Sequence, residues 1–69
     1  MVKLTLNGTE REFDGGITLA ELLRKIQIDP ERPGVAVARN GEVIRRADLA
    51  ATLVQEGDRI EVVHAVQGG

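Results

Sequence analysis

Residues 2–6, VKLTL, alternate between apolar and polar side chains, and this period predicts a half-buried strand. Asn7-Gly8 follows at once. This pair favours a two-residue hairpin because both residues tolerate a positive φ. The returning strand is expected over residues 10–13, and the Asp-Gly-Gly run at 14–16 ends it. The first part of the chain is therefore expected to be a β-hairpin.

Residues 18–27, TLAELLRKIQ, carry the pattern of an amphipathic helix. Thr18 is a favourable N-cap and Glu21 stands three residues later, which together predict a capping box. Glu21 and Lys25 are spaced to form an i, i+4 ion pair on the solvent side. The apolar positions recur at helical spacing and form one stripe: Leu19, Leu22, Leu23 and Ile26. The Pro-containing stretch 30–33 then favours a loop.

A second hairpin is predicted in the sequence GVAVARNGEVI, again with Asn-Gly at its turn. Its first strand is apolar on both faces, since Val35 and Val37 alternate with Ala36 and Ala38. The pattern does not decide which of these two pairs faces the helix.

The run RIEVVHAV, from residue 59, predicts the last strand, with Ile60 and Val62 on one face. A short helical or irregular segment is expected before it, around residues 48–51. The order is then β-β-α-β-β-β, and the last strand must pair beside the first, because the first hairpin has no other partner. We predict an α+β fold, a ubiquitin-like β-grasp, in which one main helix covers one face of a mixed sheet of about five strands. Residues 1–64 are expected to form this domain and residues 65–69 a flexible diglycine tail.

The composition narrows the functional class. The chain has 69 residues and no cysteine, so one domain with a thin core is expected. Its 9 basic residues are scattered, 11 acidic residues bring the net charge to −2, and Phe13 is the only aromatic residue. Nucleic-acid binding ordinarily needs a basic stripe and aromatic platforms, so we expect no nucleic-acid partner. With neither a signal peptide nor an apolar run of about 20 residues, we expect a cytoplasmic protein that does not enter the membrane.

The sequence offers few groups for catalysis. His64 is the only histidine. No Ser, Asp or Glu is placed by the sequence to complete a relay with it, so we interpret it as a partly exposed strand residue. Gly15-Gly16 lacks the Lys-Ser/Thr of a phosphate-binding loop and is interpreted as a strand-to-helix turn. No cluster of His and carboxylates has the spacing of metal ligands. We expect no enzyme activity in this chain alone, no cofactor bound to it and no metal site.

The sequence ends in VVHAVQGG, and two interpretations of Gly68-Gly69 are open. One is an ordinary frayed terminus. The other is a chemical handle, because an α-carboxylate is ionised at neutral pH and its adenylation by ATP makes the acyl carbon open to sulfur or nitrogen nucleophiles. Glycine leaves that carbon unhindered, and residues 65–69 span roughly 17 Å when extended, enough to enter a narrow tunnel in a partner. The small fold and the shortage of catalytic groups favour the handle.

Over essentially its whole length, the chain resembles the ThiS family, the sulfur carrier proteins of bacterial thiamine biosynthesis. The resemblance rests on the first strand ending in LNG, the helix start TLAELL, the hairpin VAVARNGEVI and the close EGDRIEVVHAVQGG. The small sulfur-carrier subunit of molybdopterin synthase, which shares the fold and the diglycine, is an alternative. A ubiquitin-like modifier that forms isopeptide bonds is another.

The resemblance implies a carrier that works with partner enzymes. An E1-like adenylyltransferase of the ThiF type would adenylate the carboxylate of Gly69 with magnesium and ATP, and a sulfur donor protein would convert it to a thiocarboxylate. Thiazole synthase, of the ThiG type, would then receive the tail in its active site and accept the sulfur. Gly68 would give a slim approach, and Val66 and Gln67 would lie in the partner's channel.

We expect docking to use the sheet face that the helix leaves open. The candidates near the tail are Val63, Ala65 and whichever of Ala36 and Ala38 points outward. Exposed apolar residues that form a patch often mark partner surfaces. Packing within the sheet is the alternative interpretation of the same residues.

Overall fold

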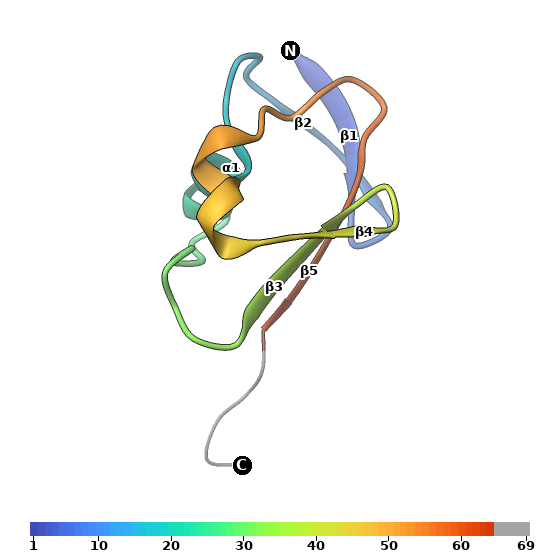
Figure 1. Ribbon diagram of the computed structural model, residues 1–69. Coiled ribbons are helices and arrows are strands. Elements are labelled where there is room, and N and C mark those ends of the chain that lie inside the picture. Colours follow the sequence, from blue (N-terminus) through green and yellow to red (C-terminus); the bar gives the residue numbers. More distant parts are fainter. Residues whose placement is uncertain (65–69) are drawn as a thin grey trace.

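The computed structural model describes residues 1–64 of the chain. One mixed sheet of five strands carries a single α-helix across one of its faces (Figure 1). The elements are β1 (Val2–Leu6), β2 (Thr9–Phe13), α1 (Leu19–Lys25), β3 (Val35–Arg39), β4 (Glu42–Ile44), the 3-10 helix η1 (Arg46–Ala51) and β5 (Arg59–His64). This is the predicted element order, and the segment expected around residues 48–51 is η1.

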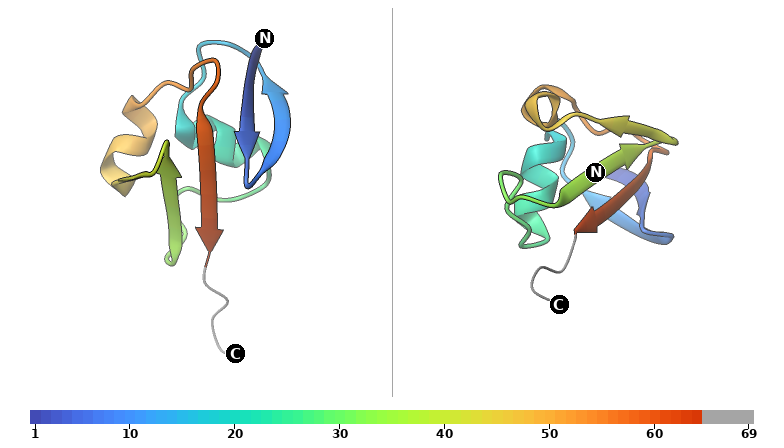
Figure 2. Two further views of the ribbon diagram at one scale, coloured as in Figure 1. Left: turned by 90° about the vertical axis from the view of Figure 1, so that its right-hand side faces the viewer. Right: turned by 60° about the horizontal axis from the view of Figure 1, so that its bottom comes forward.

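The last strand of the sequence lies in the middle of the sheet. The strand order is β2-β1-β5-β3-β4. β5 runs parallel to β1 and antiparallel to β3, while the two hairpins β1-β2 and β3-β4 are antiparallel. In the left-hand view of Figure 2 the sheet stands in front and α1 lies behind it. The predicted pairing of the last strand with the first, and with it the β-grasp topology, is confirmed.

The core lies between the sheet and α1. Strand alternation directs Leu4 and Leu6 of β1 and Ile60 and Val62 of β5 into it. Burying a large aliphatic side chain completely contributes about 1.5–3 kcal/mol relative to leaving it exposed. The buried apolar residues are Leu4, Leu6, Phe13, Ile17, Leu19, Ala20, Leu22, Leu23, Val37, Leu49, Val54, Ile60 and Val62.

α1 begins as predicted and ends earlier than predicted. At its start, the Glu21 N–H donates to Thr18 Oγ1 at 3.2 Å and the Thr18 N–H donates to Glu21 Oε1 at 2.9 Å, which is a capping box. At its end, Gln27 adopts a left-handed φ of 65° and the Ile28 N–H donates to the Leu23 carbonyl at 2.8 Å. With the bond from the Gln27 N–H to the Arg24 carbonyl at 3.0 Å, this bond forms a Schellman motif. The helix therefore ends at Lys25, before the end of the predicted range 18–27.

The expected ion pair between Glu21 and Lys25 is wrong. The Glu21 carboxylate is occupied by the capping box, where it accepts from Thr18. Lys25 Nζ instead lies 3.9 Å from Asp14 Oδ2, in the segment between β2 and α1. The cap takes precedence because it satisfies a backbone N–H at the helix start, which an exposed ion pair does not.

Both predicted Asn-Gly turns are present. Asn7 and Gly8 have φ values of 51° and 83°, and Asn40 and Gly41 have φ values of 53° and 85°. Two successive left-handed residues are the geometry of the hairpin turn that these pairs favour. The two asparagines, far apart in the sequence, lie on opposite sides of β5, because β1 and β3 are its two neighbours.

Candidate functional site

β5 directly precedes the last five residues of the sequence, Ala-Val-Gln-Gly-Gly, so its surroundings are the candidate site. It runs toward the end of the molecule opposite the N-terminus (Figure 1). Ile60 and Val62 point into the core with exposed fractions of 0 % and 6 %, whereas Val63 is 65 % exposed. Successive residues of this strand thus serve two different surfaces.

The beginning of β5 is held by a buried carboxylate. Asp58 is 6 % exposed and accepts from the Gln55 N–H at 2.9 Å and from Asn40 Nδ2 at 3.2 Å. Arg39 Nε lies 3.4 Å from Asp58 Oδ2 and supplies the opposite charge. A buried charge is tolerated when it is paired and hydrogen-bonded in this way. Asp58, which directly precedes β5, therefore anchors the beginning of that strand.

β3 settles which alanines point outward. Val37 is buried in the core, while Ala36 is exposed and Ala38 half-buried on the open face. Ala36 pairs with Val63 across β5, and Ala38 pairs with Val43 across β4, so these four side chains share one face. We call them the apolar patch: Ala36, Ala38, Val43 and Val63. Together with Val37 and Glu61, the patch lines a hollow of ≈ 230 Å³.

The structure describes three of the four predicted docking candidates and places all three on the open face of the sheet. Ala36, Ala38 and Val63 belong to the apolar patch, and Ala65 lies outside the described residues. Sequence reasoning missed Val43, which is 70 % exposed. The sequence does contain a signal for Val43. In a hairpin with Asn-Gly at its turn, Val43 is paired with Ala38, so the two side chains share a face.

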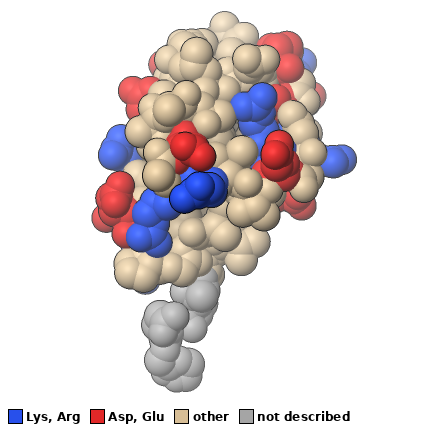
Figure 3. Space-filling model, in the orientation of Figure 1, with Lys and Arg blue, Asp and Glu red and all other residues tan. Residues whose placement is uncertain are grey.

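The half of the open face that β1 and β2 form is charged and polar. Cross-strand pairs place charged and polar side chains there: Lys3 opposite Glu12, and Thr5 opposite Glu10. Figure 3, which views the molecule from the side of the sheet, likewise shows acidic and basic side chains interspersed, without a field of one sign. The apolar patch is therefore bordered on the same sheet by a charged surface, which is the arrangement of a small docking site with a polar rim.

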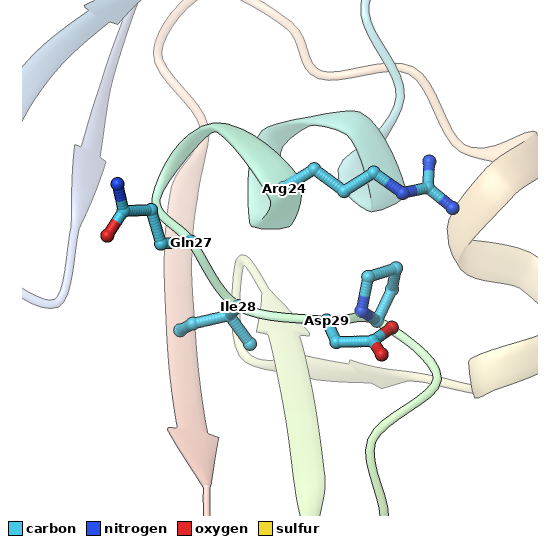
Figure 4. Close-up of a pocket in the computed structure, with 5 residues that line it drawn as sticks. Arg24, Gln27, Ile28 and Asp29 are labelled. Carbon is cyan, nitrogen blue, oxygen red and sulfur yellow. The ribbon is translucent and has the colours of Figure 1, made fainter.

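A larger hollow, of ≈ 390 Å³, lies at the end of α1. It is lined by Arg24, Gln27, Ile28, Asp29 and Pro30. Figure 4 shows Arg24 extending to one side of it while the amide of Gln27 points to the opposite side. The polar groups do not converge on one point, so the hollow lacks the arrangement by which a pocket orients a small ligand.

Reactive groups do not gather elsewhere in residues 1–64. His64 is exposed at the end of β5, and Gly15-Gly16 forms the turn before α1. In this part of the chain, no three His, Asp or Glu side chains are close enough to hold a metal ion. None of the helices in residues 1–64 has the length and apolarity needed to span a bilayer.

The predicted tail residues Val66, Gln67, Gly68 and Gly69 lie outside the described residues, as does the predicted thiocarboxylate position on Gly69. The proposed boundary between a domain over residues 1–64 and a tail over residues 65–69 stays a prediction. What the structure supplies is the position and surroundings of the strand that precedes them.

The comparisons with known proteins agree with one another. The chain is 43% identical over 68 residues to a thiazole synthase of Magnetococcus marinus, covering 99% of this chain and 20% of that protein, so it spans about a fifth of that relative's length. It is 31% identical to the sulfur carrier protein ThiS of Escherichia coli, covering 99% of this chain and 100% of that protein. A crystal structure of the thiamine biosynthesis protein ThiS from Geobacter metallireducens superposes with a TM-score of 0.79 at 34% identity, covering 99% and 100% of the two chains. The ThiS family model matches residues 4–69, and we conclude that this chain is a member of the ThiS family.

Proposed function

We propose that this chain is a sulfur carrier of thiamine biosynthesis that delivers sulfur as a thiocarboxylate on Gly69. The observation that carries the proposal is the family match over residues 4–69, which extends through the diglycine. A match of the whole chain to a named sulfur carrier supports it. The relatives named for thiamine biosynthesis favour this pathway over molybdopterin synthesis and over a ubiquitin-like modifier.

The chemistry takes place on the last carboxylate, in the active sites of partners. The Gly69 carboxylate attacks the α-phosphorus of magnesium-bound ATP, pyrophosphate leaves, and an acyl-adenylate forms. The terminal sulfur of a persulfide on a donor protein then attacks the acyl carbon, AMP leaves, and an acyl disulfide forms. A thiol attacks that S–S bond, which releases the thiocarboxylate and leaves a disulfide behind. ATP and magnesium belong to the partner that catalyses the first step, and the chain itself acts as a co-substrate.

Two partners follow from this scheme. Thiazole synthase is the acceptor of the sulfur, which the similarity between this chain and one fifth of a thiazole synthase supports, since two functions joined in one polypeptide commonly act together. An E1-like adenylyltransferase of the ThiF type is the activating enzyme that the chemistry requires. The need for ATP favours the cytoplasm as the location.

The apolar patch is the proposed docking surface for these partners. It lies on β3, β4 and β5, and Val63 is one residue before the end of β5, so a partner that covers the patch also lies next to the start of the tail. Small side chains such as Ala36 and Ala38 let another surface approach the sheet closely, while Val43 and Val63 give it apolar area to bury.

An intact-mass measurement tests the proposal. The protein is incubated with a ThiF-type enzyme, magnesium, ATP and a persulfide donor, and its mass is compared before and after. We expect a gain equal to the difference between sulfur and oxygen, located on Gly69 by fragmentation. The gain should disappear when ATP is omitted.

Two variants make the measurement specific. Gly69→Leu adds a branched side chain beside the acyl carbon and is expected to abolish the gain of sulfur, because the tunnel admits only a slim tail. Thr9→Asp changes an exposed residue on the far strand β2 and is expected to gain sulfur normally. Absence of sulfur on the wild-type protein, or normal sulfur gain by Gly69→Leu, would contradict the proposal.

A further inference from the structure

The parallel pairing between β1 and β5 is short. It ends with the pair Leu6↔Ile60, after which the Asn7 N–H donates one more bond to the Ile60 carbonyl at 2.9 Å. The chain then turns away into β2, whereas β5 continues to His64. The second half of β5 therefore extends beyond the end of β1.

The side chain of Asn7 continues where the backbone of β1 stops. Its Nδ2 donates to the Val62 carbonyl at 3.2 Å, and its Oδ1 accepts from the Val62 N–H at 2.8 Å. One primary amide thus bonds both backbone groups of one residue, in the way that the peptide units of a neighbouring strand would. The left-handed φ of Asn7 takes the main chain into the hairpin while its amide stays against β5.

Val62 is also the last core residue of β5. The residues after it, Val63 and His64, are exposed. Beyond Val62 the pairing of β5 is with β3, through Ala36↔Val63 and Val35↔His64. Within residues 1–64, the amide of Asn7 is therefore the last hydrogen-bonded contact that β5 makes on its β1 side.

We propose that Asn7 is a positioning residue for the carrier tail. Its two side-chain bonds to Val62, which we call the clamp, hold the last part of β5 from the β1 side, while β3 holds it from the other side. The inference rests on the proposed function, in which Gly69 must reach an active site in a partner. Conformational freedom at the end of β5 has to be lost when the partner binds the residues that follow. The entropy lost in this way weakens association. The clamp removes part of this freedom in advance.

The effect belongs to binding rather than to the chemical step. Once the tail is seated, Gly69 meets the same partner groups whether or not Asn7 holds Val62. Loosening the clamp is therefore expected to raise the KM for the carrier and to leave kcat close to the wild-type value. A general loss of stability does not produce this split while the protein stays folded.

The second Asn-Gly turn supplies a matched control. Asn40 has nearly the same φ as Asn7, 53° against 51°, and also makes two side-chain hydrogen bonds. Its Oδ1 accepts from the Arg59 N–H at 2.8 Å and its Nδ2 donates to Asp58 Oδ1. It therefore holds the beginning of β5 instead of its end. Glycine accepts a positive φ, so Asn7→Gly and Asn40→Gly each remove one clamp and keep the turn.

The experiment measures pyrophosphate release by a ThiF-type enzyme with magnesium and ATP, as a function of carrier concentration. For Asn7→Gly we expect the KM for the carrier to rise about fivefold or more, with kcat within about twofold of wild type. For Asn40→Gly we expect both parameters to stay within about twofold, at a temperature where circular dichroism shows both variants folded. Amide hydrogen exchange provides a readout without a partner: the Val62 N–H should exchange about tenfold faster in Asn7→Gly and unchanged in Asn40→Gly.

The outcomes distinguish failure of the positioning role of Asn7 from failure of the proposed function. Equal changes in KM for the two variants, or faster Val62 exchange without a rise in KM, overturn the positioning role. A wild-type protein that the enzyme does not adenylate overturns the proposed function instead, and the exchange data then still test the clamp. If Asn7→Gly does not fold, Asn7→Asp replaces it, since a carboxylate keeps the acceptor for the Val62 N–H and loses the donor to the Val62 carbonyl. The same split between KM and kcat is expected of it.

Discussion

The two faces of the sheet use neighbouring residues for different purposes. On the covered face, Ile60 and Val62 are enclosed by α1 and contribute to the core, whereas on the open face Val63 is 65 % exposed beside Ala36. Val62 and Val63 have identical side chains, yet the first is 6 % exposed. The position on the strand therefore decides whether a valine stabilises the domain or is available to a partner. Substitutions on the two faces should separate stability from binding.

The largest effect is expected on the covered face. Ile60→Ala removes a side chain that is 0 % exposed and leaves a cavity in the core, which should lower the free energy of unfolding by about 3 kcal/mol. Urea unfolding followed by circular dichroism measures it. The control is Val63→Ala, three residues further along β5 and on the open face, where we expect a change within about 0.5 kcal/mol. Similar losses in the two variants would contradict the separation of the faces.

The intermediate effect is expected on the open face. Val63→Asp puts a charge into the apolar patch. We expect it to weaken binding to the proposed ThiF-type partner about tenfold, because an unpaired charge must be desolvated when the patch is covered. Isothermal titration measures the affinity. Thr9→Asp makes the same change in net charge on an exposed residue of β2 and is expected to bind like wild type. Equal weakening by both variants would indicate a long-range charge effect in place of docking.

Much of the covered face could be predicted from the sequence because it depends on local rules. Alternation in residues 2–6 placed Leu4 and Leu6, and the Thr18–Glu21 spacing placed the start of α1. The two Asn-Gly turns set the hairpins, and the fold followed from the order of the elements. Each of these signals acts over a few residues and needs no knowledge of tertiary contacts.

The open face and the clamps on β5 depend on contacts between distant residues. β3 is apolar on both faces, so only its position in the sheet decides that Val37 is buried and Ala36 exposed. The bonds from Asn7 to Val62 join residues 55 positions apart. The Asn-Gly pattern predicts the turn but does not predict these bonds. The end of α1 was missed because Gln27 takes the left-handed position that glycine usually occupies.

The smallest effect is expected on the solvent side of α1, which is neither core nor open sheet face. There the structure pairs Lys25 with Asp14, at 3.9 Å and with both side chains largely exposed, in place of the pair with Glu21 that the helical spacing suggested. A double-mutant cycle of Asp14→Ala and Lys25→Ala should give a coupling energy below about 0.5 kcal/mol that disappears at high salt, because water and ions screen exposed charges. The cycle of Glu21→Gln and Lys25→Ala should give no coupling, since Glu21 accepts from Thr18. Coupling between Glu21 and Lys25 that exceeds the coupling between Asp14 and Lys25 would mean that the ion pair competes successfully with the cap. The covered face would then owe part of its stability to charges on the outer side of the helix that encloses it.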